Sequence, residues 1–432
     1  MSTWVDDFLL AGPDDEVCLR FAGPVRRSEL RHVVSQRQNL LRDMGIEPIH
    51  SVVMQQPASL DHVATALAVW RLGAQLVTVD HRVTPAGLQD VVELMRPRAI
   101  VTQDRVTQCP MWTPRSDHLL VQVTSGSTGT PKAVGRRFAD LIGEVIKTGR
   151  LPGMPARGES MMVLAAFAHT YGLFAGLLHG LHSGAEVVVP EHVTALGLRA
   201  AAAECTGPVS IFGVPFHVRL LAAGQRIPGL RRIVSSGERL DQALLDAVDE
   251  RLGVPVGQIY GMTETGMIAG DLDGRCCPAV GVLAPGVEAH TSDSELLIGM
   301  RTSPYLGRTE PARWQAGWFC TGDAASLGPG GLVTLHGRLD SQATIGGLKV
   351  DLVAVEQIMT RMTGVEEAVV VNDGVVKAYV VLRDGGSVDT EELHRVLAPH
   401  QRPRVIHTVP SLPRTPSGKA VRNVAVLEGA LV

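Results

Sequence analysis

Strands and helices alternate along the first half of the chain, and this alternation restricts the fold more than any other feature. Residues 74–79 and 98–102 have the apolar character of buried strands, and residues 86–95 between them have helical apolar spacing. The same alternation returns after position 160 and continues to Tyr260. A helix between two strands is typical of parallel βαβ units, so we expect an α/β architecture.

Two later changes of pattern divide the chain. From Glu288 onward, short strands alternate with Gly and Pro turns, which predicts mixed sheets with a small β-barrel-like part. After residue 340 the pattern is that of a compact α+β unit of about 90 residues. We therefore predict a large N-terminal domain at 1–338 and a small C-terminal α+β domain at 339–432, joined at a hinge near Asp340.

Size and composition exclude several classes of protein. A length of 432 residues suits two or three domains, and 45% hydrophobic with 19% charged residues suits a folded chain with a large core. The net charge of −4 gives no reason to bind nucleic acid, and no apolar run reaches the length of a membrane helix. Residues 1–13 lack a signal-type segment, and the six cysteines form no C-x-x-C pair. We expect a cytoplasmic protein with no membrane insertion and no transition-metal site.

Residues 124–132 have the composition of a phosphate-binding loop. They follow a strand-like run at 119–123 and combine two glycines and hydroxyl side chains with a final lysine, whose charge can meet a phosphate. The spacing is not that of a P-loop, because position 131 is proline where that motif has glycine. A flexible surface turn is the alternative, and the downstream motifs decide between them. The residues proposed to contact the polyphosphate are Thr124, Ser125, Gly126, Ser127, Thr128, Gly129 and Lys132.

Five further motifs follow in order: SSGE at 235–238, YGMTET at 260–265, TGD at 321–323, GRLD at 337–340 and PRTPSGK at 413–419. Together with 124–132, their order and spacing resemble the adenylate-forming superfamily, which includes acyl-CoA synthetases, peptide-synthetase adenylation domains and luciferases. The resemblance covers nearly the whole chain. It implies a two-step reaction in which a carboxylate and ATP form an acyl-adenylate and pyrophosphate, and a thiol then takes the acyl group. Loop 124–132 would clamp the departing pyrophosphate.

The resemblance also implies how the nucleotide is held. Tyr260 matches the aromatic residue on the adenine face, and Gly237 and Glu238 line the other side. Thr263 matches the residue that hydrogen-bonds the α-phosphate, and Glu264 matches the Mg²⁺ ligand. The alternatives are that Tyr260 merely packs a strand end and that Glu264 is a surface carboxylate. The backbone of Gly261 and Met262 belongs to the same predicted ATP site.

Three charged residues from the last third of the chain complete this implied site. Asp323 matches the aspartate that binds both ribose hydroxyls, and Arg338 is similar to its partner. A plain surface ion pair would be the alternative, and such a pair contributes little, ~0–1 kcal/mol. Lys419 matches the catalytic lysine that reaches the carboxylate and α-phosphate oxygens, although a lysine near a chain end is often only solvated.

The resemblance further implies that one cleft serves both half-reactions. Rotation near Asp340 would remove Lys419 and bring a thiol channel into place. The residues predicted for that channel are Gly346, Gly347 and Lys349.

The acid site is predicted around His169. It stands where acyl- and aryl-CoA ligases carry a histidine beside the substrate carboxylate, and a buried core histidine is the alternative. No acidic residue lies between 160 and 185, so the ammonium of an α-amino acid would be buried unpaired. An aryl or medium acyl acid therefore fits better. The predicted pocket residues are His169, Phe212, Val214, Ser236, Gly237, Gly261, Met262, Met267 and Ile268.

Three functions compete at this point. The leading one is an ATP- and Mg²⁺-dependent acid–thiol ligase that uses CoA. The second is a stand-alone adenylation enzyme that loads a carrier-protein phosphopantetheine or an amine, because the regions before residue 124 and between Gly266 and Asp323 are short for the family. The third is a nucleotide-binding regulatory protein with a dead site. A carrier protein and a second copy of the chain, as a homodimer, are the candidate macromolecular partners.

Overall fold

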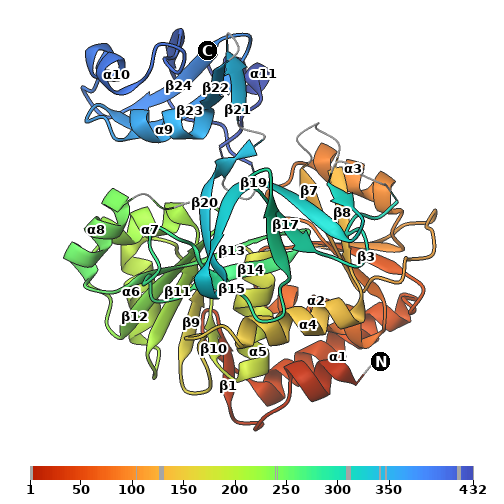
Figure 1. Cartoon of the computed structure of the whole chain (residues 1–432). Coiled ribbons are helices and arrows are strands. Elements are labelled where there is room, and N and C mark those ends of the chain that lie inside the picture. The colour runs from red at the N-terminus through yellow and green to blue at the C-terminus, as the bar shows by residue number, and fades with distance from the viewer. Residues whose placement is uncertain are drawn as a thin grey trace. The chain divides into compact units, whose positions relative to one another are not determined.

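The computed structural model describes residues 3–103, 105–125, 131–238, 240, 242–307, 313–339, 342–345, 348–415 and 420–431. The chain forms two compact units that interleave in sequence (Figure 1). The first unit comprises Met1–Glu288, Gly299–Phe319 and Pro329–Val333, and the second comprises Ala289–Ile298, Cys320–Gly328 and Thr334–Val432.

The first unit contains a six-stranded sheet with the order β6-β5-β3-β4-β7-β8. The strands are β3 (Ser51–Gln55), β4 (Gln75–Thr78), β5 (Ala99–Thr102), β6 (Val106–Gln108), β7 (Leu120–Ser125) and β8 (Pro131–Arg136). The inner strands β5, β3, β4 and β7 are parallel, whereas β6 and β8 are antiparallel to their neighbours. Helices α2 (Leu60–Arg71) and α3 (Pro85–Met95) are the crossovers, so the expected βαβ units are present.

A second, larger sheet runs in the order β15-β14-β13-β12-β11-β9-β10-β1-β2, and the first residues of β20 pair with β15. Its strands are β1 (Val17–Arg20), β2 (Pro24–Arg26), β9 (Ser160–Val163), β10 (Glu186–Val188), β11 (Val209–Gly213), β12 (Leu230–Ser236), β13 (Val256–Met262), β14 (Gly266–Asp271) and β15 (Gly281–Leu283). The strands from β1 to β13 in this order are parallel. The carboxyl ends of β11, β12 and β13 therefore meet at one edge.

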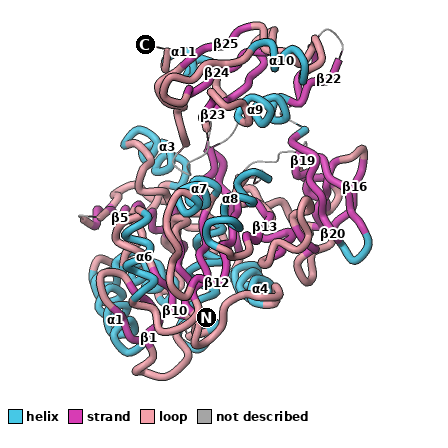
Figure 2. Tube along the Cα trace, turned by 90° about the vertical axis from the view of Figure 1, so that its left-hand side faces the viewer, coloured by secondary structure: helices cyan, strands magenta, loops and turns pink. Residues whose placement is uncertain are grey.

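Helices cover both faces of the larger sheet. One core packs α6, α7 and α8 against β9 to β12, and Figure 2 looks toward this face. A second core joins the opposite face to the six-stranded sheet through buried residues of α1, α2, α4, η2 and α5. The helices are η1 (Val5–Leu9), α1 (Arg27–Asp43), α4 (Phe138–Gly149), η2 (Tyr171–Leu178), α5 (His179–Ser183), α6 (Ala195–Ala203), α7 (Pro215–Ala222) and α8 (Gln242–Leu252). Burial of these apolar faces drives the layering.

The run of small and apolar residues at 172–181 predicts a helix, and the structure differs from this prediction in one respect. Its first part, η2, is a π-helix, and only His179–Ser183 is α-helical. Gly172 lies against the preceding loop, where a Cβ would stand 2.3 Å from the carbonyl oxygen of Ala166. Such wide turns are frequent beside functional sites, and η2 begins two residues after His169.

The second unit has strands β16, β17, β19 and β20 in consecutive hydrogen-bonding order, followed by a compact α+β part. In that part β23 pairs antiparallel with β24, which pairs parallel with β25, and α9 packs on them through Val355 and Met359. The elements from Ala289 onward are β16 (Ala289–Ser292), β17 (Glu295–Gly299), β18 (Trp314–Gln315), β19 (Trp318–Gly328), η3 (Pro329–Gly331), β20 (Leu332–Arg338), β21 (Gln342–Ile345), β22 (Leu348–Asp351), α9 (Leu352–Thr360), β23 (Val365–Asn372), β24 (Val376–Leu382), α10 (Thr390–Val396), β25 (Val405–Thr408) and α11 (Val424–Gly429). Of these, β18, η3 and the first residues of β19 and β20 fall in the first unit.

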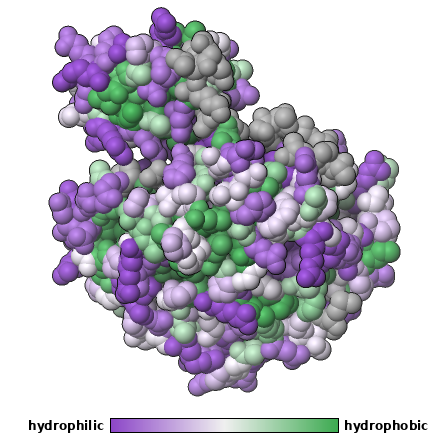
Figure 3. Space-filling view, in the orientation of Figure 1, coloured by the Kyte–Doolittle hydropathy of each residue, from purple (hydrophilic) through white to green (hydrophobic). Residues whose placement is uncertain are grey.

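The short strands expected after Glu288 and the α+β pattern expected after residue 340 are both present. The domain boundary at residue 338 stays a prediction, and its hinge residue Asp340 lies outside the described residues. Within the described part of the chain, no helix is long and apolar enough to cross a membrane. The face drawn in Figure 3 mixes hydrophilic and hydrophobic side chains, and exposed large apolar residues such as Met111 and Leu196 are scattered in sequence.

Candidate active site

The motif residues of the first unit gather at the carboxyl ends of β11, β12 and β13. Phe212 lies in β11, Ser236 ends β12, and Tyr260 lies near the end of β13. In α/β sheets, ligands bind at this edge. Gly237 follows β12 with φ +98°, a conformation that favours glycine, and a Cβ there would meet only Val214, at 3.9 Å. Space is thus open beside the chain where the sequence places the adenine.

The turn that carries Thr263 and Glu264 is fixed by a buried carboxylate from another element. Glu144 of α4 accepts a hydrogen bond from the N–H of Met267 at 2.7 Å, and Lys147 pairs with it at 2.7 Å. Gly266 has φ +75°, and a Cβ there would overlap this carboxylate. Glu144 therefore sets the start of β14 and, through it, the turn between β13 and β14.

A second support of this turn comes from the hairpin of the predicted phosphate loop. Strands β7 and β8 pair from Leu120 and Arg136 down to Ser125 and Pro131. At the far end of that hairpin, Arg136 donates to the carbonyl oxygen of Thr263 at 2.8 Å. The phosphate-loop hairpin and the Thr263–Glu264 turn are thus tied together.

Tyr305 links two charged residues that the sequence assigned to phosphate chemistry. Its hydroxyl donates to Glu264 Oε1 at 2.9 Å, and Lys132 Nζ lies 5.7 Å from the centre of its ring. Backbone hydrogen bonds hold the segment around Tyr305 against β8: Gly135 N–H to Pro304 O, and Leu306 N–H to Ala133 O. Lys132 and Glu264 thus contact the same tyrosine, Lys132 over its ring and Glu264 at its hydroxyl.

The loop that bears His169 is anchored to the six-stranded sheet. Both Thr78 of β4 and Gln122 of β7 donate to the carbonyl oxygen of Ala168, at 3.0 and 2.9 Å. Thr170 in turn donates to Gln122 at 2.8 Å. Gln122 lies two residues before the phosphate loop, so the predicted acid and phosphate sites share one supporting strand.

A buried carboxylate binds the His169 ring. Asp80, which follows β4, accepts a hydrogen bond from His169 Nε2 at 2.9 Å. The Arg82 side chain donates to both oxygens of Asp80, at 2.9 and 2.8 Å. Burial alone would raise the pKa of Asp80, but the hydrogen bonds from Arg82 and His169 prevail and lower it well below its usual value. Asp80 is therefore ionised at neutral pH.

The predicted acid pocket has an apolar wall with one half-buried histidine beside it. Phe212 is buried, and Tyr171 beside it donates to the carbonyl oxygen of Val234 at 2.8 Å. His217 of α7 accepts from the N–H of Val214 at 3.1 Å, and burial, followed by the charge of Arg82, lowers its pKa to about 4. The ring is neutral at pH 7. Since neighbouring strand residues point to opposite faces, at most one of Met267 and Ile268 faces this pocket.

The residues predicted for the ribose belong to the second unit. Arg338 Nη1 lies 3.2 Å from Asp323 Oδ1, and the N–H of Asp323 donates to the hydroxyl oxygen of Thr321 at 3.0 Å. Thr321 itself donates to the carbonyl oxygen of Leu296 at 2.8 Å. Asp323 is buried. The short chain of hydrogen bonds through Thr321 holds its backbone, and Arg338 contacts its carboxylate.

Several predicted residues are not placed. Those outside the described residues are Gly126, Ser127, Thr128, Gly129, Asp340, Gly346, Gly347 and Lys419. Ser125 and Lys349 are described only by their backbone, in β7 and β22. Glu238 is exposed beside Gly237. The roles of these residues stay predictions.

Sequence reasoning missed the supporting residues Asp80, Arg82, Arg136, Glu144 and Tyr305. None belongs to the motifs that carried the resemblance. The signal that could have found Asp80 is its place directly after a parallel strand, where functional side chains of α/β sheets concentrate. Tyr305 has no such signal, because its role depends on a bridge to β8.

The donor set around Glu264 fits a magnesium ion that also binds phosphate. Among the described residues there is no group of three or more His, Cys, Asp or Glu side chains that could hold a metal. Mg²⁺ needs fewer protein ligands than this, because it keeps several waters and takes substrate phosphate oxygens. Tyr305 occupies Glu264 Oε1. The Oε2 atom has no hydrogen-bond partner within the described part of the chain and suits such an ion.

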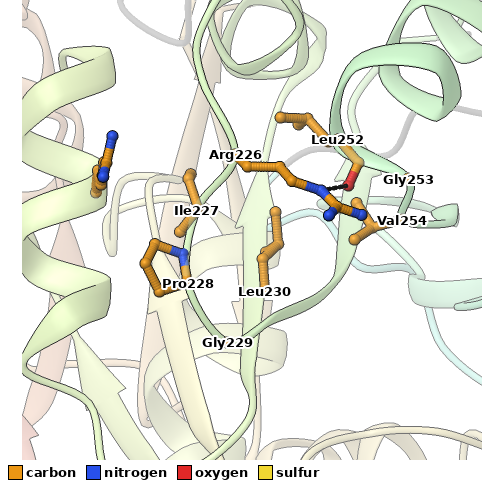
Figure 4. A pocket seen from close by; sticks show the side chains of 9 residues that line it. Arg226, Ile227, Pro228, Gly229, Leu230, Leu252, Gly253 and Val254 are labelled. Carbon is orange, nitrogen blue, oxygen red and sulfur yellow. Dashed lines mark hydrogen bonds between the residues drawn. The ribbon is translucent and has the colours of Figure 1, made fainter.

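A cavity of about 500 Å³ lies elsewhere on the first unit, at the amino ends of β12 and β13 (Figure 4). Arg226 Nε donates to the carbonyl oxygen of Leu252 at its wall, at 3.4 Å. The lining residues are Arg199, Arg226, Ile227, Pro228, Gly229, Leu230, Leu252, Gly253 and Val254. It shares no residue with the site predicted from the motifs, which lies at the opposite ends of the same strands.

Two family models match the chain. The model described as AMP-binding enzyme matches residues 13–113 and 107–297, and the model described as AMP-binding enzyme C-terminal domain matches residues 354–419. A curated relative, p-hydroxybenzoic acid–AMP ligase FadD22 of Mycobacterium tuberculosis, is 26% identical over 95% of this chain. The chain spans 66% of the length of that relative. The 4-chlorobenzoate–CoA ligase of an Arthrobacter species is 25% identical over 91% of this chain and 88% of its own.

Solved structures have the same fold. O-succinylbenzoate Coenzyme A synthetase from Bacillus subtilis, in complex with AMP, superposes with a TM-score of 0.84 at 20% identity. The superposition covers 98% of this chain and 97% of the other. The predicted fold class, a large sheet-rich α/β region with a smaller C-terminal part, is confirmed.

Proposed function

The chain belongs to the AMP-binding enzyme family, part of the adenylate-forming superfamily, and we propose that it is an ATP-dependent acid–thiol ligase. In this proposal an aryl or other hydrophobic carboxylate becomes an acyl-adenylate with release of pyrophosphate, and the acyl group then passes to the thiol of CoA. The observation that carries the proposal is the linkage of Lys132, Tyr305 and Glu264. This linkage brings together a positive charge, Lys132, and a carboxylate that can bind a metal ion, Glu264, and both are needed to stabilise a phosphate group during its transfer.

The first chemical step joins two anions, so the protein must neutralise charge where it develops. Lys132 supplies a positive charge at the end of the β7–β8 hairpin, toward the phosphate that leaves. Glu264 would hold Mg²⁺, which neutralises phosphate oxygens when bound. Thr263, whose carbonyl oxygen is held by Arg136, would place its side chain at the α-phosphate. Tyr260 would carry the adenine, beside the open space at Gly237.

The acid in this proposal is aromatic or otherwise apolar. Phe212 and the other pocket residues offer an apolar wall, and His169 offers a polar group for the carboxylate. The names of FadD22 and of the 4-chlorobenzoate ligase both specify benzoic acids, which supports an aryl substrate. The carboxylate of Asp80 lies close by, but Arg82 and His169 already occupy it. An amino-acid ammonium would thus find no unpaired partner there.

The thiol acceptor has two candidates. CoA is the first, supported by the name of the 4-chlorobenzoate–CoA ligase. A carrier-protein phosphopantetheine arm, or an amine, is the second, because FadD22 is named for ligation to AMP alone. The predicted roles of Asp323, Arg338, Lys349 and Lys419 belong to either version.

Pyrophosphate–ATP exchange across aromatic, fatty and short acids tests the proposal. We expect exchange that depends on a carboxylate and on Mg²⁺, and that is fastest with an aromatic acid. With the accepted acid, formation of acyl-CoA separates the two acceptors, since a carrier-dependent enzyme forms no thioester with CoA alone. An absence of exchange with every acid would refute the proposal and revive a nucleotide-binding regulatory role.

A further inference from the structure

The carboxylate of Asp80 is fully engaged by protein groups, so it cannot itself hold a substrate. Its side chain is only 2% exposed. Oδ1 accepts from the backbone N–H and the Nε of Arg82, both at 2.9 Å, and Oδ2 accepts from Arg82 Nη2 and His169 Nε2. His81 Nδ1 also lies 3.5 Å from Oδ1. Any influence of Asp80 on a bound acid must pass through one of these three partners.

The side chains of Arg82 and His81 are 48% and 43% exposed, but His169 is the partner placed beside the acid in the proposed function. Its side chain is 39% exposed, and Nδ1 has no hydrogen-bond partner among the described residues. A substrate carboxylate only accepts hydrogen bonds, so the ring can hold it through Nδ1 only while protons sit on both nitrogens. Asp80 provides the acceptor for the second of these protons.

Arg82 reduces the repulsion between the carboxylate of Asp80 and the carboxylate of a bound acid. A bare carboxylate at Asp80 would repel the carboxylate of an incoming acid. The bidentate guanidinium compensates the Asp80 charge, and such a pair also fixes the orientation of the acceptor. A plain structural ion pair would explain the Arg82 contacts but would leave the bond to His169 without consequence.

We propose that Asp80 is a positioning residue for the acid: it holds His169 by Nε2, so that Nδ1 is the nitrogen that meets the substrate carboxylate, and Arg82 compensates its charge. This inference rests on the proposed function, in which His169 stands beside the acid. In this inference the buried carboxylate of Asp80 orients the His169 ring, which in turn binds the substrate carboxylate.

A double-mutant cycle on the exchange reaction tests this role. Asp80→Ala removes the acceptor and its charge, whereas Asp80→Asn keeps an accepting oxygen and removes only the charge. We expect Asp80→Ala to raise the KM for the acid about tenfold to a hundredfold and to leave the KM for ATP within about twofold. Asp80→Asn should fall between wild type and alanine. In the His169→Ala background, Asp80→Ala should add no further effect.

Glu186 supplies a matched control. It is also a buried carboxylate with an arginine partner, at 2.8 Å from Arg20 Nε, and it accepts from the hydroxyl of Ser160 at 2.9 Å. Glu186→Gln should leave the KM for the acid unchanged. If Asp80→Ala costs as much without His169 as with it, or raises the KM for ATP equally, the positioning role is refuted. If the alanine variant does not fold, the same comparison of KM values can be made with Asp80→Asn.

Nitrogen NMR of the histidine rings gives a readout that does not need turnover. In the wild-type protein, we expect the His169 ring to carry a proton on Nε2, and in Asp80→Ala we expect this preference to disappear. A wild-type ring protonated on Nδ1 alone would overturn the inference. If no acid supports exchange, the proposed function fails, and the NMR result still decides whether Asp80 orients His169.

Discussion

The two ends of the candidate site are built differently. At the phosphate end, Lys132 and Glu264 belong to sequence motifs, and Tyr305 joins them. At the acid end, His169 was predicted from the sequence, whereas its partners Asp80 and Arg82 come from a loop after β4 and belong to no motif. The charged residues of the phosphate end can therefore be identified from local sequence motifs. The residues that support His169 at the acid end are brought together only by the fold.

The phosphate end should show the largest loss on a single change. Glu264→Gln keeps the size of the side chain but removes the charge that would bind Mg²⁺. We expect adenylation to fall roughly 10²–10³-fold, with the KM for the acid little changed. Exchange at varied Mg²⁺ measures this. If the variant exchanged pyrophosphate as fast as the wild type, Glu264 would not be a metal ligand, and the contrast between the phosphate end and the acid end would be wrong.

The contribution of the acid end to the stability of the fold should depend on pH. Burial lowers the pKa of His62 and His217 to about 4, and His62 packs edge-on against Phe167 of the His169 loop. A group whose pKa is lowered on folding stabilises the fold above its unfolded pKa, near 6.5, and this stability is lost as the pH falls from there toward 4. At pH 5 the loss amounts to about 2 kcal/mol for each histidine.

Urea unfolding of the wild type and of His217→Asn checks this expectation. The asparagine oxygen can accept the N–H of Val214 as His217 does, but asparagine does not titrate. We expect the free energy of unfolding of the variant to fall less between pH 7 and pH 5. Equal slopes of unfolding free energy against pH for the two proteins would contradict the assignment of a neutral, half-buried His217.

Tyr305→Phe should sharpen the contrast between the two ends. It removes the hydroxyl donor to Glu264 and keeps the ring beside Lys132. We expect adenylation to fall about tenfold, because the orientation of the metal-binding carboxylate is relaxed while the carboxylate remains. The KM for the acid should not change. A rise in that KM comparable with the loss in rate would mean that the two ends are not separable.

The cavity at the amino ends of β12 and β13 should show the smallest effect. Arg226→Ala removes a lining side chain that donates a hydrogen bond to the carbonyl oxygen of Leu252. We expect exchange to stay within about twofold of wild type, because the change is at the opposite ends of the strands from the site. A larger loss would show that this edge of the sheet takes part in the reaction.

The sequence predicted the site where a residue's role depends on its immediate neighbours. Tyr260, Thr263 and Glu264 follow β13 in one motif, and the alternation of strands and helices placed their strand in a parallel sheet. Asp80 and Tyr305 could not be predicted in the same way. Their roles depend on strand order, with β4 beside β7 and the segment at Tyr305 beside β8, and strand order is not encoded in any short stretch.

The same limit applies to conformation. The π-helical turns of η2 arise where Gly172 meets the carbonyl oxygen of Ala166, a contact that apolar spacing does not report. The antiparallel pairing of β13 and β14 depends on the turn that Glu144 holds from a separate helix. Periodicity therefore located the elements, while their contacts had to come from the structure.

The most direct measurement is mass spectrometry of the enzyme quenched with ATP, Mg²⁺ and an accepted aromatic acid, with no thiol present. We expect the acyl-adenylate together with pyrophosphate, and less of both in Glu264→Gln. An acyl phosphate with ADP, or ATP left intact with every acid tried, would contradict it.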